Sequence, residues 1–130
     1  MARAYLIIAG LMWVLYGSYL LVMPQALAAT AGVAATTLTG VIELRAMYGG
    51  LEMAVGAFAL SAAVLPGMLR SGLLAMGLAC AGLGLTRLGS AAAAGEFSTY
   101  TRQGLALELT LTALALWLFL RQARAAPRRT

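Results

Sequence analysis

The sequence contains no lysine and no histidine, a single cysteine, and few charged residues of either sign. Charged residues make up 10% of the chain, well below the roughly 25% of soluble domains. Without histidine and with one cysteine, Cys80, the chain lacks the side chains of a zinc site and cannot form an internal disulfide. We therefore expect no metal and no cofactor, and we interpret Cys80 as a small packing residue.

Apolar side chains, in contrast, are abundant. Of the 130 residues, 62% are hydrophobic, and the mean hydropathy is +0.90. A soluble domain of this size leaves much of its surface in water and has too little interior to bury so much apolar area. The surplus must face lipid. The sequence therefore predicts an integral membrane protein in which residues 1–130 form a single transmembrane domain.

Four apolar runs are long enough to be transmembrane helices, since about 20 residues cross a hydrocarbon core of about 30 Å. We expect these helices at about residues 4–23, 43–65, 71–89 and 104–120. Pro24 follows the first run, and Pro66-Gly67, a turn signal, closes the second. Lipid offers no partner to free backbone groups, and the sequence has no alternating strand pattern. The predicted fold is therefore all-α, an integral membrane four-helix bundle.

Two segments connect these spans less regularly, residues 25–41 and residues 90–103. The first is rich in alanine and threonine and has room for a short helix at the membrane interface. A cleaved signal peptide is an alternative for the first span, because Arg3 precedes it and Ala26-Leu27-Ala28 resembles a cleavage site. The run exceeds the roughly 7–15 apolar residues of a signal peptide, so we expect a retained helix.

The arginines predict the orientation. If both termini lie on one side, that side carries Arg3, Arg70, Arg121, Arg124, Arg128 and Arg129, and the opposite side carries Arg45, Arg87 and Arg102. The positive-inside rule then places the N and C termini in the cytoplasm. The arginines do not form a basic stripe with aromatic residues, so we expect no nucleic-acid partner. An amino-acid composition rich in arginine, alanine and glycine indicates a bacterial genome. We therefore expect a multi-pass protein of the bacterial inner membrane.

A small group of polar residues lies inside or at the edge of the apolar spans, where a charge at mid-membrane costs roughly 2.5–3.5 kcal/mol. The group comprises Glu43, Arg45, Tyr48, Glu52, Arg87 and Glu108. In an up-down bundle their positions all lie toward the extracytoplasmic face. We therefore expect the residues of this group to form one polar cluster.

The spacing on the second span adds detail to this cluster. Arg45, Tyr48 and Glu52 are related as i, i+3 and i+7, so they share one face of an α-helix. Gly49 and Gly56 fall on the same side. The result is a polar stripe beside glycines, which suits a face that contacts another helix or encloses a pocket.

The segment from Glu43 to Gly50 reads Glu-Leu-Arg-Ala-Met-Tyr-Gly-Gly. It resembles a family of small bacterial membrane proteins, the domain of unknown function 4345 family, in which a Glu-x-Arg-x-x-Tyr-Gly-Gly signature opens the second span. The later Leu-Thr-Arg-Leu-Gly at residues 85–89 and the carboxylate of Glu108 are similar to the same pattern. The resemblance covers most of the chain and implies a DoxX-like four-helix architecture. It implies no established activity and no catalytic residue.

Two interpretations of the cluster stay open. In the first, Arg45 and Arg87 pair with Glu52 and Glu108 and lock the helices in register. In the second, the cluster binds the polar group of a lipid, a quinone or another hydrophobic small molecule, or the protein acts through the cluster as an accessory membrane subunit. The arginines would then contact anionic or carbonyl groups at the end of an apolar pocket.

Catalysis and transport are the alternatives to binding. A membrane enzyme would use Glu52 or Glu108 as general acid/base on a lipophilic substrate. A proton- or cation-linked transporter is the third alternative. It would need charged residues throughout the depth of the membrane, whereas those of this chain are expected near one face. Binding is favoured over both. The expected partners are membrane lipids and a hydrophobic small molecule, with a homo-oligomer or a larger membrane complex left open.

Overall fold

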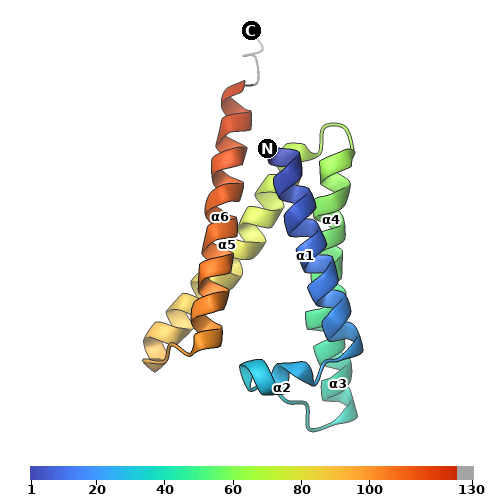
Figure 1. Ribbon diagram of the computed structural model, residues 1–130, viewed down its shortest axis with the longest axis vertical. Coiled ribbons are helices and arrows are strands. Elements are labelled where there is room, and N and C mark those ends of the chain that lie inside the picture. Colours follow the sequence, from blue (N-terminus) through green and yellow to red (C-terminus); the bar gives the residue numbers. More distant parts are fainter. Residues whose placement is uncertain (126–130) are drawn as a thin grey trace. The chain divides into compact units, whose positions relative to one another are not determined.

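The computed structural model describes the backbone of residues 1–125 and the side chains of residues 1–122. Its helical segments are α1 (Ala2–Val22), α2 (Ala26–Ala31), α3 (Leu38–Leu44), η1 (Arg45–Leu51), α4 (Glu52–Val64), α5 (Leu69–Ala94) and α6 (Thr99–Ala125) (Figure 1). The segments α3, η1 and α4 follow one another without a break and form the second span. In the described part of the chain, 4 helices are long and apolar enough to cross a membrane, which confirms the predicted all-α membrane fold.

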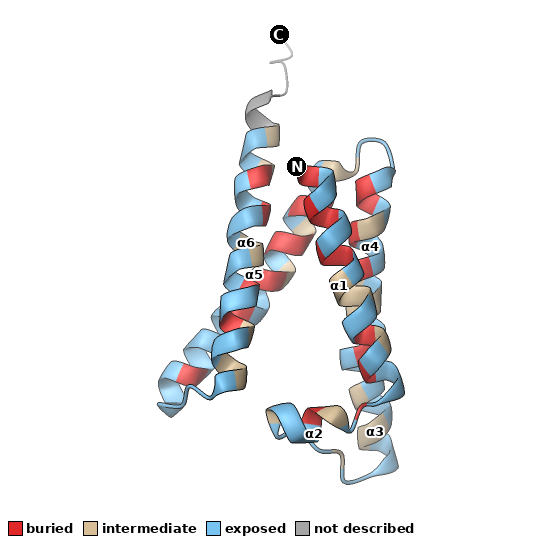
Figure 2. Ribbon diagram, viewed as in Figure 1, coloured by how far each residue is buried: buried red, intermediate tan, exposed pale blue. Residues whose placement is uncertain are grey.

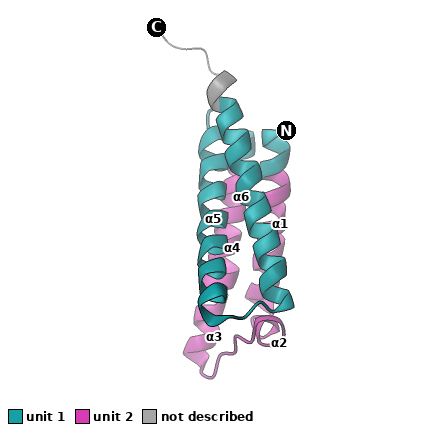
Figure 3. Ribbon diagram, turned by 90° about the vertical axis from the view of Figure 1, so that its left-hand side faces the viewer, with its two compact units in different colours: residues 1–6, 62–130 teal, residues 7–61 magenta. Residues whose placement is uncertain are grey.

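The chain divides into two compact units, which Figure 3 shows in different colours. Unit 1 consists of residues 1–6 and 62–130, and therefore contains α5 and α6. Unit 2 consists of residues 7–61, and therefore contains most of α1, α2, α3, η1 and most of α4. Each unit has its own helix packing, and we describe the two separately.

Helix ends follow local capping chemistry. Thr37 precedes the second span, and its hydroxyl oxygen accepts a hydrogen bond from the backbone N–H of Gly40 at 3.0 Å. Gly95 ends α5 in the left-handed conformation, with φ of +65°. Ser98 then caps α6, where its hydroxyl oxygen accepts from the N–H of Thr101 at 3.2 Å. The connection between α5 and α6 is thus only residues 95–98.

These helix ends differ from those expected from hydropathy. The second span begins at Leu38 rather than at residue 43, α5 continues to Ala94, and α6 begins at Thr99. The reason is that an apolar run marks the part of a helix inside hydrocarbon, whereas the backbone hydrogen bonds continue until a cap replaces them. Residues 90–94 and 99–103, expected in a polar connection, are therefore helical.

Arginines near the N-terminus of α5 and the C-terminus of α6 lie against aromatic rings of unit 1. The guanidinium carbon of Arg70 is 4.7 Å from the centre of the Phe119 ring, and that of Arg121 is 4.6 Å from the Trp117 ring. Both distances suit a cation–π contact. Arg124, Arg128 and Arg129 contributed to the predicted orientation of the termini. Their side chains lie outside the described residues.

Unit 2 is held together by contact between glycines of α1 and of the second span. A Cβ atom at Gly56 would lie 2.6 Å from the carbonyl oxygen of Gly10, and one at Gly17 would lie 2.8 Å from that of Gly49. The two backbones therefore touch at two levels and run antiparallel. Such close approach is typical of membrane helices that pack through small residues. The two glycines that spacing placed on one side of the second span both face α1.

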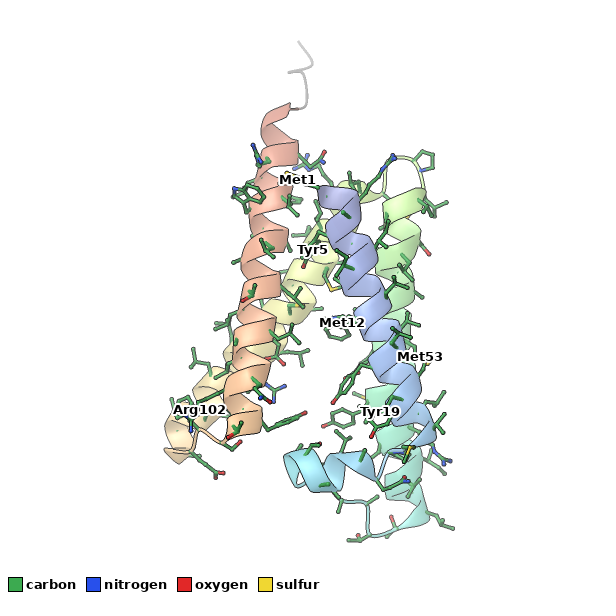
Figure 4. All side chains as sticks on the ribbon, in the orientation of Figure 1. Met1, Tyr5, Met12, Tyr19, Met53 and Arg102 are labelled. Carbon is green, nitrogen blue, oxygen red and sulfur yellow. The ribbon has the colours of Figure 1, made fainter. Side chains whose placement is uncertain are left out.

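Unit 1 uses small residues in the same way. A Cβ atom at Gly77 would lie 3.2 Å from the Cβ of Ala115, so α5 and α6 approach closely there. The hydroxyl of Tyr5, labelled in Figure 4, donates to the carbonyl oxygen of Leu111 on α6 at 2.8 Å. The thiol of Cys80 is buried and lies 3.8 Å from the sulfur of Met76, in keeping with a packing role.

Large apolar side chains cover much of the outer helix surface. Figure 2 shows exposed positions along every long helix, and they include Leu15, Leu78 and Leu85 at 67%, 62% and 61% exposure. In water, an apolar surface this extensive would be a liability. In a bilayer, the same side chains face hydrocarbon, which agrees with the predicted surplus of apolar area.

We expect Gly56→Ala to lower the free energy of unfolding by about 1–3 kcal/mol, because the new Cβ would overlap the backbone of Gly10. Gly82→Ala is the matched control, since no atom lies within 4 Å of the position where its Cβ would be. Thermal unfolding in detergent, followed by helical circular dichroism, measures both. Equal unfolding midpoints for the two variants would contradict the close contact between α1 and α4.

Candidate functional site

Arg87 of α5 and Glu108 of α6 form an ion pair in unit 1. The Arg87 Nη2 donates to Glu108 Oε1 at 2.6 Å, and Nε donates to Oε2 at 3.0 Å. This is a two-point contact between the planar guanidinium and the carboxylate, the strongest geometry for such a pair. The Glu108 side chain is 10% exposed and the Arg87 side chain 29%. Because α5 extends to Ala94, the pair lies about two turns inside the end of its helix.

Three residues of α6, spaced four apart, surround the Arg87 side chain. Gly104 leaves room for the guanidinium, because a Cβ there would lie 3.0 Å from Arg87 Nε. Tyr100 lies one turn before Gly104, and its ring centre is 5.7 Å from the guanidinium carbon of Arg87. Glu108 lies one turn after Gly104. Positions i, i+4 and i+8 share one face of a helix. The sequence analysis did not single out Tyr100, whose segment was expected to be a connection, or Gly104, the first residue of the expected fourth span, although the four-residue spacing up to Glu108 was visible.

The other predicted cluster residues lie on the second span, in unit 2. Glu43 is exposed in α3, Arg45 and Tyr48 are exposed in η1, and Glu52 is half-buried at the start of α4. The segment η1 is a π-helix of 7 residues. Such segments are rare in proteins, and those that occur are often found at functional sites. Nothing in the spacing of the sequence predicted this one.

The π-helix changes which residues share a face. Its hydrogen bonds run from i to i+5, so each turn holds more residues than a turn of an α-helix. Gly49 is buried against Leu21 of α1, whereas Arg45 and Tyr48 are exposed. The α-helical stripe expected from i, i+3 and i+7 therefore divides into a buried part and an exposed part.

The polar residues of the second span are not paired with one another. Within residues 1–122, no ion pair or hydrogen bond joins Arg45 to Glu43 or to Glu52. Glu52 Oε2 is buried and has no hydrogen-bond partner among these described residues. The structure thus brings together Arg87 and Glu108 but not Arg45 and Glu52. That the two sets converge into one cluster stays a prediction.

Comparison with protein families gives one finding that covers nearly the whole chain. The family model described as Domain of unknown function (DUF4345) matches residues 1–119. The chain belongs to this family. Comparison of the DUF4345 chain with curated proteins and with solved structures gives no match. The matched region includes the π-helix and the Arg87–Glu108 pair.

The two polar sets of this DUF4345 protein suit different chemistry. The guanidinium of Arg87 binds both carboxylate oxygens of Glu108, so the pair suits a structural lock between α5 and α6. The second span offers the donors of Arg45 and Tyr48 and the acceptor of Glu52. Those groups are available to another molecule.

We expect Arg87→Ala to destabilise the DUF4345 protein by up to about 3 kcal/mol, because it leaves Glu108 buried without its partner. Arg102→Ala is the control. Arg102, labelled in Figure 4, lies at the first turn of α6 and is exposed, and its side chain donates only to the carbonyl oxygen of Phe97 among the described groups. Unfolding in detergent measures both variants.

The double variant Arg87→Ala/Glu108→Gln separates loss of the pair from loss of packing. Removing the stranded charge is expected to restore part of the stability lost in Arg87→Ala. Equal stability of Arg87→Ala and Arg102→Ala would show that the pair does not lock α5 to α6.

Proposed function

We propose that this DUF4345 protein binds a lipid, a quinone or another hydrophobic small molecule, and that Arg45, Tyr48 and Glu52 contact its polar group. One observation carries the proposal: the structural lock accounts for Arg87 and Glu108 but leaves the polar residues of the second span without partners among the described residues. Charged groups in a membrane span are retained when they pair, line a cavity or function. Those of the second span do not pair.

The chemistry around these residues suits an amphiphilic ligand. Arg45 and Tyr48 supply hydrogen-bond donors, which match phosphate, carboxylate or carbonyl oxygens. Met47 and Leu51, on the same π-helix, are 53% and 52% exposed. Polar groups set among exposed apolar side chains resemble the usual design of a site for a hydrophobic molecule. The π-helix itself is a further feature common at binding sites.

The location of the protein belongs to the same proposal. We place it in the bacterial inner membrane, with both termini in the cytoplasm and the polar sets of both units toward the extracytoplasmic face. The distribution of arginines supports this orientation. Arg70 and Arg121, assigned to the cytoplasmic side, lie against the rings of Phe119 and Trp117, and tryptophan is enriched at membrane interfaces.

A membrane enzyme that uses Glu52 as general acid/base is the second candidate. The observation that favours it is the contrast between the two carboxylates. Glu108 is held at two points by Arg87, whereas Glu52 has no cation bound to it among the described residues. Only a carboxyl group that can change its protonation state serves as an acid or base. A lipophilic substrate would reach it through the polar set that we assign to binding.

Native mass spectrometry of protein purified with its lipids tests the binding proposal. We expect the wild type to carry one tightly bound hydrophobic molecule, and Arg45→Ala to retain it at about one-tenth of the occupancy or less, because a hydrogen bond to a charged group contributes about 1.5–3 kcal/mol. Tyr48→Phe, which removes one donor and keeps the ring, should lower the occupancy less.

Arg102→Ala is the matched control, since it removes an exposed arginine outside the polar set of the second span. It should keep the bound molecule at the wild-type level. Equal occupancy in Arg45→Ala and Arg102→Ala, or a wild type without any bound molecule, would remove the support for a ligand site on the π-helix.

A further inference from the structure

We propose that Glu52 is a proton-binding site inside the membrane span. Its Oε2 atom is buried and has no hydrogen-bond partner among the described residues. Glu52 lies four residues before Gly56 within α4, and Gly56 contacts α1. Residues four apart are neighbours on one side of an α-helix. The carboxyl group of the half-buried Glu52 therefore lies beside the contact between two apolar helices, and its Oε2 atom is shielded from solvent.

The charged and titratable groups of unit 2 give Glu52 little compensation. Besides Glu52, residues 7–61 contain only Tyr16 and Tyr19 on α1, and Glu43, Arg45 and Tyr48 on the second span. Arg45 is the only cation of these residues. It is exposed, lies about two turns before Glu52, and forms no ion pair with it. An ionised Glu52 would thus carry charge on a buried oxygen, Oε2, without a counter-charge bonded to it.

Protonation removes this difficulty without any movement of the helices. A buried charge is costly unless it is paired, and the usual outcome is that the group neutralises. The two carboxyl groups of the spans then differ in their partners. Glu108 accepts hydrogen bonds from Arg87 at both oxygens, whereas Glu52 gains or loses one proton, which changes the net charge of residues 7–61 by one. The proposal holds whether or not the π-helix binds a ligand.

A hydrophobic carbodiimide is a suitable probe, because it enters the bilayer and reacts with the acid form of a carboxyl group. The carboxyl O–H adds across one C=N bond: the oxygen bonds to the central carbon, and the proton goes to nitrogen. The acyl group of this O-acylisourea then migrates to nitrogen and gives a stable N-acylurea. All atoms of both reactants remain in the product, so no oxidant or reductant is needed.

The experiment treats the wild-type protein in liposomes with dicyclohexylcarbodiimide and locates the adduct by peptide mass spectrometry. We expect Glu52 to be labelled at least about tenfold more than Glu108, because both oxygens of Glu108 accept charge-assisted hydrogen bonds from Arg87, whereas Glu52 Oε2 has no partner among the described residues. Labelling should fall as the pH rises, because the carboxylate form has no proton to transfer. A water-soluble carbodiimide should instead label the exposed Glu43 and Glu96.

Two variants complete the test. Glu52→Gln should lose the adduct at this position, and Arg87→Ala should gain an adduct at Glu108, because that carboxylate loses its counter-charge. The comparison of reagents on the wild type needs no variant, so it stands even if a variant fails to fold. Equal labelling of Glu52 and Glu108 in the wild type, or the absence of an adduct at Glu52, would overturn the proposal. The occupancy measured for Arg45→Ala is a separate readout that does not depend on this result.

Discussion

Arg87 and Glu108 meet inside a pair of apolar helices, and the packing of unit 1 is arranged around that contact. Gly104 leaves the space that the guanidinium occupies, and a Cβ at Gly84 would lie 3.3 Å from the Cβ of Glu108. The charges require the pair, because an unpaired charge within an apolar span is costly. The pair in turn requires small residues, because a larger side chain at either glycine would separate the two groups.

Glycine has the same role in unit 2, where no charge pair links the helices. There, backbone meets backbone at Gly10 and Gly56 and again at Gly17 and Gly49. Lipid provides no hydrophobic driving force between helices, so close packing has to supply the attraction. The chain thus uses two kinds of helix contact. The ion pair determines which residues of α5 and α6 meet, and the glycine contacts determine the register of α1 against the second span.

Hydropathy and charge predicted most of the fold, since a helix must be long and apolar to cross a bilayer and an unpaired charge inside the bilayer is costly. The same reasoning identified Arg87 and Glu108 as residues in need of partners. It did not identify Tyr100, because the composition of residues 90–103 resembles a loop and hydropathy does not show where a helix is capped. It did not identify Gly104 either, because hydropathy does not show which side chain a glycine makes room for. The π-helix was missed for another reason. The periodicity used for Arg45, Tyr48 and Glu52 assumes α-helical turns, and one turn of wider geometry invalidates it.

The choice of arginine at position 87 has a further consequence. A guanidinium keeps its proton at any physiological pH, whereas a lysine in an apolar setting readily becomes neutral. The contact with Glu108 is therefore not lost through deprotonation of the cation, and its strength depends on the local dielectric constant. Replacing a water-permeable detergent shell with a thick, ordered bilayer would tighten α5 against α6, so the rigidity of this helix pair follows the lipid that surrounds it.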